Sequence, residues 1–234
     1  MRGMDIDTLQ RRLRATLPMA RLDCRPLPGC PEISLALIND DFPLGPLPPD
    51  VMRAVIARPA YWSLCWGSGL ALARHLLDRP ELVRGRRVVD LGAGSGVVAI
   101  AAAMAGAARV IACDSDPDAL AATAANAALN RVAVTLADDL ADVPTDNDLM
   151  LMADVLYDRE NLPLLAAACR HADAVLVADS RIAELPDPAY RQVGTIATLT
   201  YPNLGEFDEF GTVRLFYRDT TAEGSTSSTV MSSR

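Results

Sequence analysis

The sequence predicts an α/β fold in which a mostly parallel sheet carries helices on both faces. From Arg87 onward, short apolar runs of strand character alternate with helical segments. A glycine-rich turn joins the first of these strands to the first helix. The last two apolar runs, Thr195–Thr200 and Thr212–Tyr217, follow each other without a helical segment between them. They predict an antiparallel edge strand, paired with its neighbour at one side of the sheet.

Four elements precede this repeating pattern. Leu9, Leu13 and Leu17 form an apolar stripe that predicts an amphipathic helix. The segment that contains Ile33 and Ile38 is rich in β-formers and predicts a strand, and four prolines predict an irregular loop after it. The expected elements are helix Asp7–Leu17, strand Ile33–Ile38, loop Asp40–Asp50 and helix Leu70–Leu77.

The repeating part begins with a strand and continues through right-handed crossovers. The expected elements are strand Arg87–Leu91, helix Val97–Met104, strand Arg109–Asp114, helix Pro117–Asn130, strand Val132–Leu136, strand Leu149–Asp154, helix Asn161–Arg170 and strand Ala174–Asp179. We expect three parts in the chain. Residues 1–60 form a helix, a strand and a proline-rich loop that pack on the core, residues 61–219 form the core, and residues 220–234 form a flexible polar tail.

Composition narrows the class of protein. Half of the 234 residues are hydrophobic and 22% are charged, which is enough to fill a core and excludes general disorder. The net charge of −8 argues against a nucleic-acid partner, which would require a basic face. The longest apolar run, Val97–Ala108, is shorter than the roughly 20 residues of a membrane span. We therefore expect no nucleic acid and no membrane as partner, while the oligomeric state stays open.

The cysteines and the first residues of the chain indicate the expected cellular compartment. The five cysteines form no C-x-x-C pair, so we expect no metal site and a reducing cytoplasm. The first residues are charged and lack an apolar stretch followed by a small-residue cleavage site, so we expect no signal peptide.

The glycine turn predicts a ligand site. Gly92, Gly94 and Gly96 allow a sharp turn and leave no Cβ between the backbone and a ligand. Together with Ala93, they bring the ligand to free amides at a helix N-terminus. Any dinucleotide-binding fold could use such a turn.

Two further residues favour one ligand. Asp90 precedes the glycines, where it would repel a pyrophosphate but attract a cation. Val97 stands where a dinucleotide fingerprint has a third small residue. S-adenosylmethionine, which carries an ammonium and a sulfonium, therefore suits this turn better than a nicotinamide dinucleotide.

Acidic residues follow the next two strands. Asp114 lies about 20 residues beyond Gly94, the spacing at which a carboxylate at a strand end accepts the ribose hydroxyls, and Ser115 follows it. Asp138 and Asp139 follow the third strand, where a side chain could accept the adenine amino hydrogens. Asp138 alone could equally be a plain loop acid.

The fourth strand ends in Asp154-Val-Leu-Tyr157, and here the sequence resembles a known family. This D-x-x-Y resembles the motif after the corresponding strand of seven-β-strand protein lysine methyltransferases. The segment Pro59–Ala73, which contains Trp66, is similar to the tryptophan-rich entry of the same group, and Pro31–Ile38 and Asp90–Gly96 fit too. The likeness is greatest to the methyltransferases of the electron transfer flavoprotein β-subunit and their bacterial relatives, and it runs from Pro31 to Tyr217. Ribosomal protein L11 methyltransferases are similar in the core but carry Asn-Ile-Leu-Ala at the D-x-x-Y position, which disfavours that alternative.

The resemblance implies a Rossmann-like class I methyltransferase with a seven-stranded sheet, whose core at 61–219 binds S-adenosylmethionine. It implies N-methylation of a lysine on a protein partner. It also implies that Trp66 lies against the cofactor, that Asp154 contributes to both cofactor and catalytic sites as a positioning group, and that Tyr157 orients the amine or walls its channel. The acidic segment Gly205–Phe210 would favour a basic target surface.

Three alternatives remain from the residues themselves. The chain could be a non-catalytic S-adenosylmethionine-binding module, or an N-methyltransferase acting on a small amine or pyridine. A nicotinamide-dinucleotide enzyme is the third, and Asp90 and Val97 disfavour it.

Overall fold

The structure is a computed structural model that describes residues 6–205, 207 and 210–221. The predicted tail beyond Thr221 and the acidic residues Glu206, Asp208 and Glu209 lie outside the described residues. The helices are α1 Ile6–Thr16, α2 Pro49–Ala57, α3 Gly67–Asp78, α4 Val97–Met104, α5 Pro117–Leu129 and α6 Pro163–His171. The strands are β1 Leu22–Leu27, β2 Cys30–Ile38, β3 Arg87–Leu91, β4 Arg109–Cys113, β5 Thr135–Ala137, β6 Leu149–Ala153, β7 Ala174–Asp179, β8 Arg191–Ala197 and β9 Thr212–Asp219.

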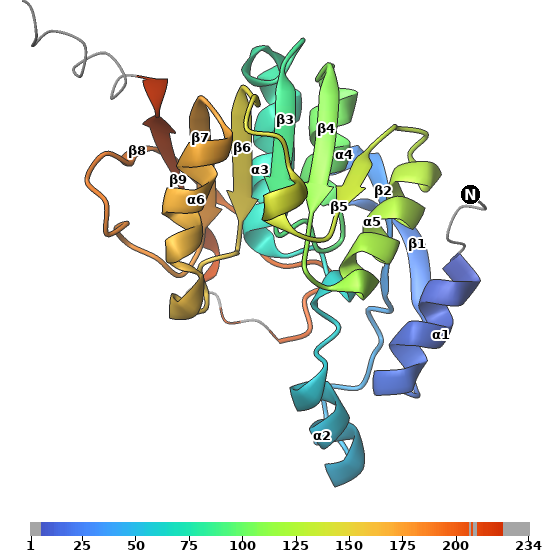
Figure 1. Ribbon diagram of the computed structural model, residues 1–234. Helices are drawn as coiled ribbons and strands as arrows, with labels where there is room; N and C mark the ends of the chain where they lie inside the picture. The colour runs from blue at the N-terminus through green and yellow to red at the C-terminus, as the bar shows by residue number, and fades with distance from the viewer. Residues whose placement is uncertain (1–5, 206, 208–209, 222–234) are drawn as a thin grey trace, which may run out of the picture.

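Seven strands form the main sheet in the order β5-β4-β3-β6-β7-β9-β8 (Figure 1). The pairs within β5-β4-β3-β6-β7 are parallel, and β9 is antiparallel to both β7 and β8. The predicted fold class is therefore confirmed, including an antiparallel pair at one edge. The strand order reverses between β4 and β6, on either side of β3, which is the switch point where such sheets bind ligands.

Two strand positions were predicted wrongly. β5 begins at Thr135 rather than Val132, because its pairing with β4 starts at Thr135 opposite Ile111. β8 spans Arg191–Ala197 instead of Thr195–Thr200, and its burial pattern is mostly exposed, so apolar content does not mark it. Thr200 has instead left the sheet, and its hydroxyl accepts a hydrogen bond from the amide of Gly67 at 3.2 Å.

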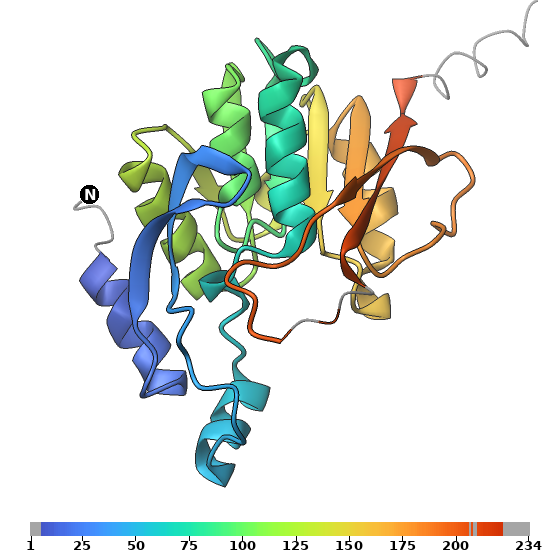
Figure 2. The ribbon, with the colours of Figure 1, turned by 180° about the vertical axis from the view of Figure 1, so that it is seen from behind.

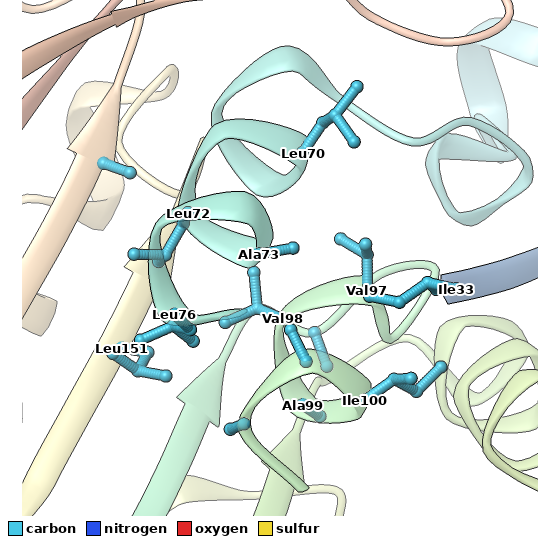
Figure 3. Close-up of a cluster of buried hydrophobic side chains, with 14 of the residues drawn as sticks. Ile33, Leu70, Leu72, Ala73, Leu76, Val97, Val98, Ala99, Ile100 and Leu151 are labelled. Carbon is cyan, nitrogen blue, oxygen red and sulfur yellow. The ribbon is translucent and has the colours of Figure 1, made fainter. Parts of the chain in front are cut away.

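The core lies on both faces of the sheet, because alternate residues of each strand point to opposite sides. On one face, α3 and α4 cover the sheet (Figures 2 and 3). Their side chains share a buried cluster with Val88 and Leu151. On the other, Leu165 of α6 packs with Val89 and Met150. This double cover explains why the central strands are continuous apolar runs.

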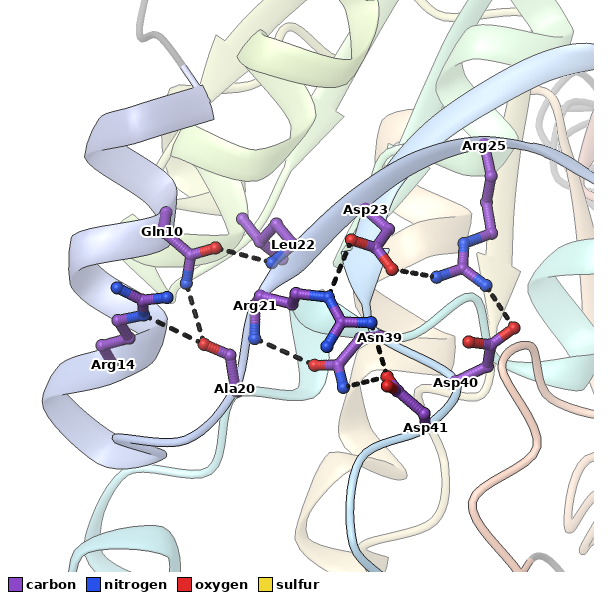
Figure 4. A network of polar contacts seen from close by, with 10 residues as sticks. All are labelled: Gln10, Arg14, Ala20, Arg21, Leu22, Asp23, Arg25, Asn39, Asp40 and Asp41. Atoms are coloured by element: carbon purple, nitrogen blue, oxygen red, sulfur yellow. Dashed lines mark hydrogen bonds and ion pairs between the residues drawn. The ribbon is translucent and has the colours of Figure 1, made fainter.

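An N-terminal hairpin of β1 and β2 forms a separate two-stranded sheet. β1 was not predicted, since Asp23, Arg25 and Pro26 interrupt its apolar residues. Its charged side chains are used in a surface network: Arg25 pairs with Asp23 and Asp40, each at 2.7 Å (Figure 4). The side chain of Gln10 in α1 donates to the carbonyl of Ala20 and accepts from the amide of Leu22, which ties α1 to the hairpin.

Asn126 of α5 and Asn130, which caps the C-terminal end of this helix, pair with the backbone of β2. Asn126 accepts a hydrogen bond from the amide of Ala36 at 2.8 Å. Asn130 accepts from the amide of Ser34 at 2.9 Å and donates to its carbonyl at 2.6 Å. The helix thus takes the place of a further strand along this side of β2.

The proline-rich loop is shorter than predicted. It ends at Pro48, and Pro49 and Asp50 already belong to α2, because proline is well tolerated at the first helical position. α2 has no buried residue and projects away from the body of the molecule at the bottom of Figure 1. Within the described part of the chain, no helix is long and apolar enough to cross a membrane.

Candidate functional site

The glycine turn after β3 has the left-handed backbone that only glycine adopts at little cost. Gly92, Gly94 and Gly96 have φ angles of +78°, +54° and +82°. A Cβ at Gly92 would lie 2.6 Å from the Val155 side chain, and one at Gly96 would lie 3.0 Å from Thr123. A Cβ at Gly94 would meet nothing closer than the Gly92 carbonyl oxygen at 4.0 Å. Gly94 is therefore the position of this turn with room beside it.

Asp114 lies directly beside this position. One carboxylate oxygen accepts a hydrogen bond from the amide of Gly94 and the other accepts from the amide of Asp116, both at 2.9 Å. The side chain is half-buried, and burial raises its pKa. Ser115, the next residue, is exposed. The structure thus brings together the glycine turn and the carboxylate that the sequence predicts for a ribose.

Asp90 lies beneath the turn and is only 1% exposed. One of its oxygens accepts a hydrogen bond from the amide of Ala99 in α4 at 2.9 Å. Burial is the main cause that raises its pKa to about 7, and the charge of Asp114 adds to it. The carboxylate therefore holds the start of α4 in place, and its attraction of a bound cation stays a prediction.

Asp138 and Asp139 follow β5 and are both exposed. One oxygen of Asp139 accepts from the amide of Ala141 at 2.8 Å, so this side chain caps a short helical turn. Ala137, the residue before these two acids, accepts a hydrogen bond from the amide of Asp114 at 3.1 Å. The backbone before Asp138 therefore lies beside the residue that contacts the glycine turn. Ala93, at the centre of the glycine turn, is buried.

Asp154, after β6, is held by the start of α3. Its two oxygens accept hydrogen bonds from the amide of Ser68 at 3.0 Å and from the Ser68 hydroxyl at 2.6 Å, and the Ser180 hydroxyl lies 3.5 Å away. Burial raises the pKa of Asp154 to about 6, assisted by the charge of Asp179 and opposed by the Ser68 hydrogen bonds and by Arg181. Its φ of +52° is unusual for a residue with a side chain, and such backbone strain is concentrated at functional sites.

Three aromatic rings belong to the segments that the Ser68–Asp154 pair joins: Tyr61 and Trp66 precede α3, and Tyr157 follows Asp154. The Tyr61 ring meets the Trp66 ring edge-on at 5.8 Å and the Tyr157 ring at 5.7 Å between centroids. The indole nitrogen of Trp66 donates to the carbonyl of Tyr61 at 2.9 Å. Trp66 is half-buried, whereas Tyr157 is 52% exposed. The predicted residues Trp66 and Tyr157 are therefore linked through Tyr61.

Sequence reasoning missed Ser68 and Arg181. Arg181 follows the carboxyl end of β7, and its guanidinium lies 6.0 Å from the Trp66 ring and 4.7 Å from the Phe210 ring. The rule that located Asp114 and Asp154, that parallel strands end at one edge, would also have located Arg181. Ser68 carried a weaker signal, its position two residues after Trp66.

Other features of the described chain lie apart from this edge. A cavity of about 580 Å³ is bounded by Leu70 and the segment 197–201, and none of the predicted site residues lines it. Among the described residues, no group of three or more His, Cys, Asp or Glu side chains could hold a metal ion.

The fold is the Rossmann-like fold of class I methyltransferases. Its marks are a mostly parallel sheet with an antiparallel β9, a glycine turn after β3 and an acid after β4. The solved structure of magnesium protoporphyrin IX methyltransferase from Synechocystis has this fold, with a TM-score of 0.50 and 18% identity over 74% of this chain and 84% of that one. Residues 71–158 match the family described as ribosomal protein L11 methyltransferase (PrmA).

Sequence relatives narrow the class to a family. The electron transfer flavoprotein beta subunit lysine methyltransferase homolog of Caenorhabditis elegans is 31% identical over 184 residues, which cover 69% of this chain and 74% of the relative. The zebrafish electron transfer flavoprotein beta subunit lysine methyltransferase is 40% identical over 140 residues, or 56% of this chain. That match spans about half of the zebrafish protein, 54% of its length. The chain belongs to the family of electron transfer flavoprotein β-subunit lysine methyltransferases, as the sequence motifs predicted.

Proposed function

We propose that the protein is an S-adenosylmethionine-dependent N-methyltransferase that methylates a lysine side chain of a protein resembling the electron transfer flavoprotein β-subunit. The observation that carries the proposal is the hydrogen bond between Gly94 and Asp114, which joins an open glycine turn to a carboxylate at the switch point of the sheet. Membership of the family supports the same function. The net charge of −8 supports a protein partner rather than a nucleic acid, and the five free cysteines support a cytoplasmic location.

The residues at this edge fit S-adenosylmethionine. The open side of Gly94 leaves space for the ligand, and half-buried Asp114 has lone pairs for the ribose hydroxyls. The acids along the edge suit a ligand that carries two cationic groups. We assign the binding surface to Trp66, Asp90, Gly92, Ala93, Gly94, Gly96, Asp114, Ser115, Asp138, Asp139 and Asp154. When bound, S-adenosylmethionine supplies an electrophilic methyl carbon attached to a sulfonium.

The protein must present a lysine amine to that carbon in its neutral form. Because free lysine has a pKa of about 10.4, the neutral amine costs about 4.6 kcal/mol at pH 7. Asp154, with a pKa of about 6, is mostly ionised at neutral pH and is a weak base. Its role is to hold and align the amine, and alignment supplies much of the acceleration. Tyr157, which is 52% exposed, orients the same amine through its hydroxyl, and water takes the proton.

We also propose the division of the chain that its sequence suggests. Residues 61–219 form the cofactor-binding core, and residues 1–60 are an accessory segment that packs on it. An ion pair at 2.5 Å between Arg12 of α1 and Asp118 of α5 supports this arrangement. So does the packing of Leu9 and Leu13 against the alanines of α5.

The direct test incubates the purified protein with methyl-labelled S-adenosylmethionine and either lysate or purified electron transfer flavoprotein. Label on a lysine of a protein band, found by mass spectrometry, supports the proposal. Label confined to small molecules would assign the enzyme to amines or pyridines, and cofactor binding without any transfer would leave a binding module. Calorimetry that detects binding of NAD but not of S-adenosylmethionine would refute the proposal that S-adenosylmethionine is the cofactor.

A kinetic test addresses the residues. Asp154→Ala and Tyr157→Ala should lower kcat more than they weaken cofactor binding, since both lie on the acceptor side of the site. Wild-type turnover in both variants would refute their assigned roles.

A further inference from the structure

Three acidic residues at alternate positions connect the glycine turn to the first turn of α5, and we call Asp114, Asp116 and Asp118 the carboxylate series. Asp114 accepts hydrogen bonds from the amides of Gly94 and Asp116, both at 2.9 Å. Asp116 in turn accepts from the amide of Asp118 at 2.8 Å. Aspartates that bond to the backbone two residues further on fix local turns. The carboxylate series therefore runs without a break from the proposed cofactor turn to Asp118.

Asp118 ends the series between two arginines and is only 7% exposed. One of its oxygens lies 2.5 Å from the guanidinium of Arg12 in α1, and the other lies 3.2 Å from the guanidinium of Arg58. Arg58 caps the C-terminal end of α2, and the segment that follows it leads to Trp66 at the start of α3. The two oxygens thus hold two separate parts of the N-terminal region.

The segment of residues 58–66 carries Tyr61 and Trp66 of the proposed site, and it packs against the start of α5. The side chain of Trp62 is 2% exposed and shares a buried cluster with Ala119 of α5. Well-packed side chains of this kind resist displacement, because a shift would open a void. The position of the start of α5 therefore sets the position of the segment, and the pair with Asp118 fixes its first residue.

We propose that Asp118 is a positioning residue, which couples cofactor binding at Asp114 to the position of residues 58–66. The coupling runs through the ion pair of Asp118 with Arg58. When Asp114 also accepts the ribose hydroxyls, the carboxylate series is held at both ends, by the cofactor and by the arginine. This inference rests on the proposed function and adds to it an order of binding. The protein substrate binds the cofactor-loaded enzyme in preference to the empty one.

The size of the coupling follows from the exposure of the ion pair. The Arg58 side chain is 65% exposed and that of Asp118 is 10% exposed, and a pair that is open to water on one side contributes little. We therefore expect the cofactor to restrict the opening of residues 58–66 by about two- to fivefold. Since coupling is reciprocal, its loss should weaken cofactor binding by the same small factor.

Amide hydrogen exchange measures the coupling without methyl transfer. The amide of Ser63 donates to the carbonyl of Ala60 at 3.0 Å, and the amide of Leu64 donates to that of Tyr61 at 3.3 Å. Their exchange rates report local opening of the segment. The probe is S-adenosylhomocysteine, the cofactor after loss of its methyl group. At saturation it should slow exchange of both amides about two- to fivefold in the wild type and hardly at all in Asp118→Asn.

Matched variants separate the two arginines. Arg58→Gln, at an exposed side chain that folding does not require, should lose the coupling as Asp118→Asn does. Arg58→Lys keeps the charge and should retain most of the coupling. Arg12→Gln is the control, since it removes the other arginine from the same carboxylate and leaves the Arg58 pair. The double variant should lose no more than either single variant, because both residues act through one contact.

A purely structural role for Asp118 would change exchange equally with and without the probe. Equal slowing by the probe in the wild type, Asp118→Asn and Arg58→Gln would overturn the proposal. Exchange at Ser63 and Leu64 that ignores saturating probe in the wild type would also overturn it.

A methyl-transfer assay on the wild-type protein keeps the two proposals apart. Coupling without transfer to any lysine would refute the proposed function and leave the positioning role of Asp118 standing. Transfer by a protein in which the probe slows neither amide would refute the positioning role alone. In a protein that shows both, Arg58→Gln should raise KM for the protein substrate about two- to fivefold and change kcat little.

Discussion

The carboxylate of Asp154 accepts two hydrogen bonds from Ser68, one from its amide at 3.0 Å and one from its hydroxyl at 2.6 Å. This pair fastens the loop after β6 to the first turn of α3. Trp66 lies two residues before Ser68, and Tyr157 lies three residues after Asp154. The distance between Trp66 and Tyr157 therefore depends on the hydrogen bonds between Ser68 and Asp154. A negative side chain at the start of a helix is also favoured by the helix dipole.

Ser68→Ala should raise the pKa of Asp154 above about 6, because the hydroxyl hydrogen bond favours the ionised form. The acid limb of the pH–rate profile should move to higher pH, and stability should fall by about 1–2 kcal/mol. The profile and a thermal melt measure the two effects. Ser63→Ala is the control, since it removes a buried hydroxyl bonded to the carbonyl of Ala60 at 2.7 Å. A profile that shifts equally in both variants would deny Ser68 a specific role.

Asp114→Ala should weaken S-adenosylmethionine binding by tenfold or more, because hydrogen bonds to a charged acceptor contribute about 1.5–3 kcal/mol each. Calorimetry gives the dissociation constant. Asp116→Ala is the matched control, as it breaks a comparable bond to the amide of Asp118 at the start of α5. If Asp114→Ala bound S-adenosylmethionine as tightly as wild type, another residue would have to make the ribose contact.

Substitutions in the glycine turn should separate stability from binding. Gly92→Ala places a methyl group 2.6 Å from Val155 and should destabilise the fold by about 2–4 kcal/mol. Gly94→Ala meets open space and should cost only about 1 kcal/mol of stability, yet it should lose most cofactor affinity. Gly85→Ala, at φ +73° with nothing within 4 Å, measures the backbone cost alone. In melting curves, Gly92→Ala should lose more stability than Gly94→Ala. In calorimetry, Gly94→Ala should show the greater specific loss of cofactor affinity.

Asp90 should make stability depend on pH. Its pKa in the folded protein is raised to about 7, so the stability that its protonated form contributes is present at low pH and is lost as pH rises from about 4 to about 7. Asp90→Asn, which keeps an acceptor for the Ala99 amide, should therefore be more stable than wild type at about pH 8 and nearly equal to it at about pH 4.

Asp148 provides a control of opposite sign. Hydrogen bonds from Arg87 lower its pKa to about 2, so its contribution is present at neutral pH and is lost on acidification. Asp148→Asn should destabilise at neutral pH and converge with wild type at low pH. If both variants changed the melting temperature in the same direction at about pH 8, the burial argument for Asp90 would be wrong.

The sequence predicts buried strands more accurately than exposed ones. The bounds of β3, α4 and β7 match their predictions, because buried apolar runs end abruptly at glycine or charged residues. β1 escaped prediction because Asp23, Arg25 and Pro26 interrupt it, and its pairing with β2 rather than its composition makes it a strand.

The candidate site is predictable where it follows from chain order and unpredictable where it depends on distant contacts. Asp114 and Asp154 could be located because parallel strands end at a common edge. The bond between Ser68 and Asp154 joins residues 86 positions apart, and no local pattern encodes it. The edge-on contact of Tyr61 and Tyr157 likewise joins segments far apart in the chain.

Asn126 and Asn130 also protect one edge of the β1–β2 hairpin. A strand edge with unpaired amides and carbonyls is a template for strands of neighbouring molecules. Asn126 and Asn130 use the amides of Ala36 and Ser34 and the carbonyl of Ser34, so these groups cannot recruit a foreign strand. Replacing both asparagines with alanine would leave these backbone groups without their side-chain partners beneath α5, which should cost about 1–3 kcal/mol for each buried group. Two amide side chains outside the cofactor-binding turn thus close this edge of β2 to strand pairing.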